Sequence, residues 1–197
     1  MQQRTVVPIS PHGEVRITKE YMELNKQLHA ERLDYGQMGS RHTDSVRGIA
    51  QVYECKSILD YGCGKQTLLE SLRVPWARGY DPCIAGLDGE PDPADLVVCT
   101  DTLEHIEPEC LEAVLNHLKF LTKRLLYVSI STRPAKKTLP DGRNTHLIVQ
   151  PSKWWLDKLL VHWDMDTCRA TEKEITCVMR VPGEAAREPV ITNNIRK

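Results

Sequence analysis

The sequence predicts an α/β fold in which a doubly wound, mostly parallel sheet carries helices on both faces and ends in an antiparallel hairpin. Three observations lead to this prediction. From residue 56 onward, short apolar runs alternate with amphipathic stretches, as in successive strand–helix units. The first run turns directly into a helix through Gly62 and Gly64, and glycine permits such a tight turn. Two strand-like runs within 165–181 flank the polar sequence TEKE, which indicates a hairpin.

The amino-terminal part is expected to contain two helices that cover the ligand site. The first helix, at 18–32, places Tyr21 and Leu28 on one apolar stripe, with Thr18 as its cap. The second helix begins after Ser40, which is expected to cap it.

The core elements are expected to follow one another as strand–helix units. Their ranges are 56–61, 66–73, 78–81, 95–100, 109–124, 125–132, 152–162 and 165–181. We therefore divide a single domain into an arm with two covering helices at 1–54, a core at 55–181 and a polar tail at 182–197. Ligands of such sheets bind beyond the carboxyl ends of the strands, so the loops there are expected to hold the site.

Composition excludes several classes of protein. The formal net charge of −1 argues against a strongly electrostatic nucleic-acid binder, duplex DNA above all. No apolar run approaches the ~20 residues of a membrane span, and the first residues do not resemble a secretory signal. The seven cysteines include no C-x-x-C pair, so we expect reduced thiols, no metal site and a cytoplasmic location. Oligomeric state is left open.

The most informative segment is SILDYGCGKQTLLESL. Its strand ends at Asp60, and a second acidic residue, Asp81, ends the next strand 21 residues later. That spacing suits a carboxylate that holds ribose hydroxyls, which fits either a dinucleotide or S-adenosylmethionine. Thr67 stands where the dinucleotide fingerprint has its third glycine, and an acidic residue before the turn suits a cationic amino-acid portion better than a pyrophosphate.

The runs LDYGCGKQTL, GYDP, DLVVCTDTLEHIEP and TLPDGRNTHLIVQPSKWW together resemble class I S-adenosylmethionine-dependent methyltransferases, in particular a type-11-like bacterial and phage branch. The resemblance covers about residues 18–181 and implies a Rossmann-like methyltransferase fold with S-adenosyl-L-methionine as cofactor.

The resemblance implies a cofactor site at the ends of three strands. Its residues are Asp60, Tyr61, Gly62, Cys63, Gly64, Asp81, Pro82, Asp101, Thr102 and Leu103. The glycine turn would lie under the methionine portion, Asp81 would accept hydrogen bonds from the ribose, and the loop at Asp101 would flank the sulfonium. Arg41 is expected to pair with the methionine carboxylate.

Two departures from the family pattern carry expectations of their own. Gln66 replaces a frequent glycine, which puts tight packing at the helix start in question. Only 13 residues separate Asp81 from Asp95, where the family usually has a helix and a strand. We predict that this unit is truncated, that the sheet loses an edge strand, and that the loop at 84–89 covers the adenine.

The substrate side is expected after the strand that ends at residue 132. The segment 133–158 has six Lys or Arg and two Asp, whereas 81–112 has ten acidic residues and no Lys or Arg. The candidate substrate-binding residues are Lys136, Arg143, Asn144 and His146. His146 and His105 are candidate general bases, needed only if the acceptor must lose a proton. The structural alternatives are a turn network at 140–146 and a loop-closing role for His105.

The predicted activity is methyl transfer to a small-molecule, nucleotide or glycan-type acceptor, with RNA or protein acceptors left open. The Asp/Asn-Pro-Pro-aromatic motif of DNA amino methylation is absent after the strand that ends in CTD. The alternatives are a non-catalytic S-adenosylmethionine-binding or scaffold protein and a nucleotide-dependent dehydrogenase of related fold.

Overall fold

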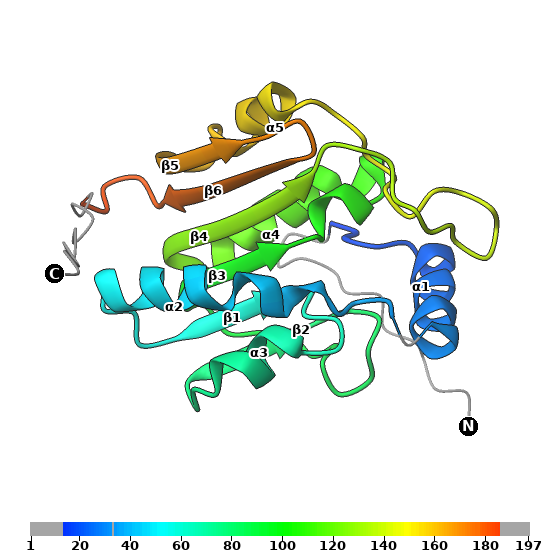
Figure 1. The fold of residues 1–197 in the computed structure, drawn as a ribbon, viewed down its shortest axis with the longest axis horizontal. Helices are drawn as coiled ribbons and strands as arrows, with labels where there is room; N and C mark the ends of the chain where they lie inside the picture. Colours follow the sequence, from blue (N-terminus) through cyan, green and yellow to red (C-terminus); the bar gives the residue numbers. More distant parts are fainter. Residues whose placement is uncertain (1–13, 33, 186–197) are drawn as a thin grey trace, which may run out of the picture.

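The computed structural model describes residues 14–32 and 34–185, so most of the predicted arm and tail lies outside the described residues. A six-stranded sheet forms its centre, in the order β2-β1-β3-β4-β6-β5 (Figure 1). The strands are β1 (Ile58–Tyr61), β2 (Ala77–Tyr80), β3 (Ala94–Thr100), β4 (Thr122–Ser131), β5 (Asp164–Ala170) and β6 (Glu174–Arg180). The first four are parallel, while β6 pairs antiparallel with both β4 and β5. The predicted fold class and the carboxyl-terminal hairpin are confirmed.

Helices cover both faces of this sheet. They are α1 (Lys19–Glu31), α2 (Thr43–Val52), α3 (Thr67–Leu72), α4 (Leu111–Leu121) and α5 (Ser152–Leu159), with short 3-10 turns η1 (Met38–His42), η2 (Leu103–His105) and η3 (Pro108–Cys110). The helices α4 and α5 pack on one face, and α2 and α3 pack on the other. Figure 1 shows α1 beside the carboxyl ends of the parallel strands. Within the described residues, every helix is too short or too polar to cross a bilayer.

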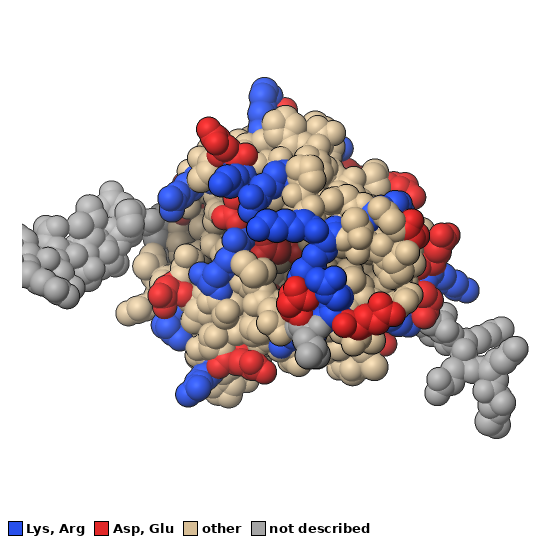
Figure 2. Space-filling model, turned by 45° about the vertical axis from the view of Figure 1, so that its right-hand side comes forward, with Lys and Arg blue, Asp and Glu red and all other residues tan. Residues whose placement is uncertain are grey.

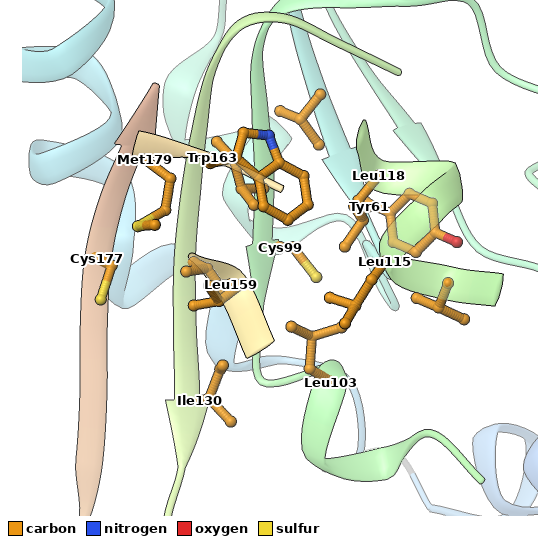
Figure 3. Close-up of a cluster of buried hydrophobic side chains, with 14 of the residues drawn as sticks. Tyr61, Cys99, Leu103, Leu115, Leu118, Ile130, Leu159, Trp163, Cys177 and Met179 are labelled. Carbon is orange, nitrogen blue, oxygen red and sulfur yellow. The ribbon is translucent and has the colours of Figure 1, made fainter. Parts of the chain in front are cut away.

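The larger core cluster lies between the sheet and the helices α4 and α5 (Figure 3). Leu115 and Leu118 of α4 have no exposed surface, and neither has Trp155 of α5. Apolar residues recur on α4 every three or four positions, which places them on the face toward the sheet. This packing holds β3 and β4 in the middle of the molecule, and the loops that follow them carry site residues.

The start of each amino-terminal helix tests a capping prediction. Thr18 caps α1 as predicted, since its Oγ accepts a hydrogen bond from the backbone N–H of Tyr21 at 3.2 Å. The predicted Ser40 cap is wrong. Ser40 lies inside the 3-10 turn η1, and α2 begins three residues later without a side-chain cap. The carbonyl of Ser40 instead accepts from the hydroxyl of Thr43 at 2.7 Å.

The predicted truncation after β2 is confirmed. Residues 81–93 contain turns and no helix, and β2 is the edge of the sheet in the described part of the chain. The loop is held by Glu90, whose carboxylate forms two hydrogen bonds with Arg16, at 3.1 and 2.7 Å. His117 of α4 contributes a further contact of 2.7 Å to Glu90. The segment before α1 thereby ties the short loop to α4.

Replacing Leu115 by alanine is expected to lower the free energy of unfolding by about 2–5 kcal/mol, because it leaves a cavity in a fully buried site. The matched control is Phe120→Ala on the same helix, since that ring is 56% exposed. Urea unfolding should show a change within about 0.5 kcal/mol for the control. Equal losses in the two variants would contradict this assignment of the core face.

Candidate functional site

A cavity of about 580 Å³ opens at the carboxyl ends of the parallel strands. Its walls come from the loops after β1, β2, β3 and β4, from α1 and η1, and from the turn before β6. This volume lies in the ordinary range for small-molecule sites. The cavity therefore occupies the position that the fold predicts for a ligand.

The glycine turn after β1 forms the floor of the cavity and is closely packed on both sides. Gly62 has φ +74°, and a Cβ there would overlap the side chain of Thr102. Gly64 has φ +50°, and a Cβ there would lie 2.7 Å from the carbonyl oxygen of Gly36. The positive φ values and the close approaches both require glycine. The turn therefore presents bare backbone to the cavity between two other loops.

Two buried carboxylates lie beside this turn. Asp60 is 3% exposed, and its side chain forms no hydrogen bond within the described chain. Burial, together with the charge of Asp81, raises the pKa of Asp60 to about 7. Burial also raises the pKa of Asp81, although its carboxylate accepts hydrogen bonds from the N–H groups of Cys83 at 2.9 Å and Gly64 at 3.0 Å. Negative charge on Asp60 thus lacks a partner in the described part of the cavity floor, whereas the two N–H groups and His29 partly compensate the charge of Asp81.

Arg41 closes one side of the cavity through ion pairs with two acidic residues. It donates to Oδ1 of Asp101 at 2.9 Å and pairs with Glu174 at the start of β6. Burial alone would raise the pKa of Asp101, but His42 and Arg41 outweigh it and lower that pKa. Asp101 has φ +50°, a conformation that directs the loop after β3 toward the cavity. Arg41 therefore lines the cavity with its guanidinium already paired with acidic residues, and its pairing with a methionine carboxylate stays a prediction.

Glu104 and two histidines stand at the wall beyond Asp101. Glu104 has no exposed surface, and its Oε1 accepts from the N–H of Ser131 at 2.8 Å. Burial raises its pKa to about 8. His105 and His146 lie edge to face with ring centroids 4.7 Å apart, and burial lowers the pKa of His105 to about 4. The two candidate bases, 41 positions apart in the sequence, are therefore neighbours at one wall of the cavity.

Most predicted cofactor residues line this one cavity. They are Arg41, Asp60, Gly62, Cys63, Gly64, Asp81, Pro82, Asp101 and Thr102. Tyr61 and Leu103 do not line it, because their side chains lie in the core beneath α4 (Figure 3). The hydroxyl of Tyr61 contacts His117 at 3.0 Å instead.

The predicted substrate residues separate into two groups. Lys136 and His146 line the cavity, whereas Arg143 and Asn144 do not. The side chain of Asn144 closes its own loop, accepting from the N–H of Ala135 at 3.0 Å and donating to the carbonyl of the same residue at 2.9 Å. Arg143 pairs with the neighbouring Asp141 at 2.7 Å. The turn network that was the structural alternative therefore accounts for the contacts of Asn144, whereas Arg143 also lies over the ring of Tyr21, 5.9 Å from its centroid.

The residues that α1 contributes to the cavity wall were not predicted individually. Ile17, Tyr21, Asn25 and His29 line it from α1 and the residue before its cap, and residues 84–89, expected to cover this end, do not line it. The expected cover at 84–89 is wrong because the loop folds back on itself, with Asp81 N–H donating to the carbonyl of Leu87 at 2.9 Å. The apolar stripe of α1 predicted only that one face of this helix is packed. Such a stripe does not show which part of the protein the helix packs against.

Basic side chains surround the mouth of the cavity. Arg133, Lys136 and Lys173 line it, are exposed and form no ion pair within the described residues. Figure 2 shows Lys and Arg gathered across the middle of the face that carries α1 and the loop after β4. Lys137 differs from them, since it is paired with Asp34 at 3.0 Å and so ties this loop to the segment after α1. Arg133, Lys136 and Lys173 thus form a positively charged rim at the mouth of the cavity, above the acidic residues of its floor.

The sequence matches no model of a known protein family and no curated protein. Among solved structures, that of DhpI in complex with SAH has a TM-score of 0.54 at 12% identity, covering 83% of this chain and 98% of that one. An O-methyltransferase family protein from Burkholderia thailandensis has the same TM-score, 0.54, at 14% identity. That match covers 84% of this chain but only 63% of that longer chain. The chain therefore has the fold of these proteins, and the predicted Rossmann-like methyltransferase fold is confirmed.

Replacing Asp60 by asparagine is expected to make the protein's stability less dependent on pH. The pKa of this carboxyl is raised from 3.8 to about 7, so the folded state holds the proton more tightly than the unfolded state. The wild type should therefore lose stability between pH 4 and pH 7 through this group, and the variant should not. Its stability relative to wild type should rise by roughly 2–3 kcal/mol from pH 5 to pH 8.

Urea unfolding at the two pH values measures this difference. Asp44→Asn is the control, because the Asp44 side chain is fully exposed. A relative stability of Asp60→Asn that does not change with pH would contradict the proposed burial of charge.

Proposed function

We propose that this chain is an S-adenosylmethionine-dependent methyltransferase that acts on an anionic small-molecule, nucleotide or glycan-type acceptor. The observation that carries the proposal is the pair of buried carboxylates in the floor beneath the glycine turn, of which Asp60 has no hydrogen-bond partner in the described chain. A ligand with a sulfonium and an ammonium group would neutralise this floor, and a pyrophosphate would not. The fold shared with an O-methyltransferase family protein supports the same conclusion.

The residues present fit such a cofactor from end to end. Asp60 faces the cavity without a hydrogen-bond partner in the described chain, as a site for a cationic group requires. Asp81 is placed to accept from ribose hydroxyls, and the apolar surfaces of Ile17, Tyr21 and Pro82 suit a planar base. The bound cofactor would supply a methyl group on a sulfonium. This chain's residues would bind and align the two reactants, and alignment alone contributes greatly to such rates.

The start of α3 argues against a dinucleotide. A Rossmann site places the pyrophosphate at an open helix amino terminus. Here α3 has six residues, and its first hydroxyl, on Thr67, accepts from the N–H of Ser40 at 3.2 Å and donates to the carbonyl of Gln37 at 3.0 Å. Gln66 has φ +59°, which explains why a glycine is frequent at this position. Protein atoms of η1 therefore cover the terminus that a pyrophosphate would need.

The rim supports an anionic acceptor. Three exposed cations without ion-pair partners in the described chain face the cavity mouth, and cationic side chains pair with phosphate and carboxylate alike. His105 and His146 lie at the wall near the rim, where an acceptor would meet the methyl group. The imidazole of His105, whose pKa is lowered to about 4, is neutral near pH 7, so its lone pair can accept a hydrogen bond from the acceptor or hold a cation.

Replacing Asp81 by alanine is expected to weaken S-adenosylmethionine binding by about 1–3 kcal/mol, the usual cost of losing charged hydrogen bonds. Titration calorimetry measures the affinity directly. The matched control is Asp92→Ala, an exposed carboxylate in the same acidic loop. If a folded Asp81→Ala protein keeps the affinity of wild type, the assignment of the ribose position is incorrect.

The double variant Lys136→Gln, Lys173→Gln is expected to raise the KM for the acceptor ~3- to 30-fold, since two exposed charge pairs together contribute about 0.6–2 kcal/mol. Affinity for the cofactor should not change. The assay measures demethylated cofactor released with pools of nucleotides, sugar phosphates and RNA, at low and high salt.

Lys123→Gln is the control for that experiment, because this exposed lysine lies at the start of β4, away from the cavity. An unchanged KM and an unchanged salt dependence in the double variant would exclude a role for the rim in acceptor binding. Absence of turnover with every pool, together with tight cofactor binding, would favour the non-catalytic alternative.

A further inference from the structure

Three side chains at the wall of the cavity bring potential metal ligands together. Glu104 and His105 come from η2, and His146 comes from the loop between β4 and α5. One donor atom from each lies within 4.8 Å of the others. Two imidazoles and one carboxylate form a donor set that favours zinc, iron, manganese or cobalt over magnesium or calcium. The cluster is therefore a candidate metal site by its chemistry as well as by its geometry.

Each member of the cluster has a donor atom without a protein partner or with its lone pair free. Oε2 of Glu104 is buried and has no hydrogen-bond partner in the described chain, and the same is true of Nδ1 of His105. His146 contacts the carbonyl of Arg133 through Nδ1 at 2.6 Å. Because a carbonyl can only accept, that Nδ1 carries the proton, and Nε2 retains its lone pair. Ligand histidines are commonly oriented by such a bond.

A buried carboxylate oxygen without a partner is costly and calls for a compensating group. We propose that Glu104, His105 and His146 bind one divalent transition-metal ion. Ligands about 2.1 Å from an ion lie roughly 3–3.5 Å apart, so the cluster must contract slightly when the ion binds. Rotation of the half-exposed His146 side chain permits that contraction.

The position of this site determines which side of a bound ion would be accessible to a ligand in the cavity. His105 and His146 line the cavity while Glu104 lies behind the wall, so open coordination positions would face the cavity. Asp101 also lines it nearby and adds negative potential. The site is at the acceptor end, beside the loop that carries the basic rim.

This inference rests on the proposed function where it concerns the acceptor. An ion there would bind an acceptor oxygen and lower the pKa of its hydroxyl, whose proton would pass to water. The oxygen would then form a bond to the methyl carbon as the carbon–sulfur bond breaks, and the electron pair of that bond would stay on sulfur. The acceptor class implied is an oxygen nucleophile that also carries negative charge.

Metal binding can be measured without any methyl acceptor. The full chain, freed of metal with a chelator, is dialysed against Zn²⁺, Mn²⁺ and Mg²⁺ in turn, and bound metal per chain is determined. We expect one Zn²⁺ or Mn²⁺ per chain and weaker binding of Mg²⁺. Glu104→Gln and His146→Gln should each weaken binding at least ~10-fold.

The variants are chosen so that a loss of metal binding cannot be attributed to unfolding of the protein. Glu104→Gln keeps a side-chain oxygen that can accept from the N–H of Ser131. His162→Gln is the matched control, since His162 follows α5, lies outside the cavity and contacts Glu112 at 3.3 Å. It should bind metal as wild type does. Circular dichroism and thermal unfolding without metal confirm that each variant is folded.

Absence of stoichiometric metal in the wild type would overturn the proposal and leave His105 and His146 as an edge-to-face pair without an ion. Equal affinities in wild type, Glu104→Gln and His146→Gln would overturn it as well. Asp81→Ala separates this inference from the proposed function, because it should keep the metal while it loses affinity for S-adenosylmethionine. Metal binding without any binding of S-adenosylmethionine by the wild type would support the metal site and contradict the proposed cofactor.

Discussion

The burial of carboxylates at the ends of neighbouring parallel strands is the constraint on which this site depends. Asp60 is the penultimate residue of β1, Asp81 follows β2 and Glu104 follows β3, and each is almost out of contact with water. Burial raises the pKa of all three. Such groups oppose folding when they are charged, and they cluster at functional sites, where a ligand can compensate them. The proposed cationic cofactor above Asp60 and the proposed metal ion beside Glu104 would be two forms of the same compensation.

A short loop after β2 and the amino-terminal helix α1 together complete the cavity that holds these groups. The loop after β2 replaces a helix–strand unit and is tied by Glu90 to Arg16 and His117. Arg16 directly precedes Ile17 and α1, and α1 contributes to the cavity wall. The tie therefore helps to hold α1 over the exposed end of the cavity. The short loop at the edge of the sheet and the amino-terminal helix act together in forming the site.

Sequence alone predicted the sheet, its hairpin and the truncation, because these follow from local apolar runs and from the 13 residues between Asp81 and Asp95. It also predicted the glycine turn, since a positive φ restricts the residue type. It did not separate Leu103, which faces the core, from its neighbour Thr102, which lines the cavity. It offered both substrate binding and a turn network for Asn144 and did not decide between them. These outcomes depend on long-range packing, which a linear motif does not encode.

The most direct test of the account is the number of protons exchanged when S-adenosylmethionine binds. Titration calorimetry near pH 7 in two buffers of different ionisation enthalpy gives both the affinity and this number. With the pKa of Asp60 near 7, a cation placed beside it should bind with a stoichiometry of one and release a fraction of a proton. Titration with NAD should give no binding. Binding of NAD in preference to S-adenosylmethionine, or S-adenosylmethionine binding without any proton release, would contradict the account.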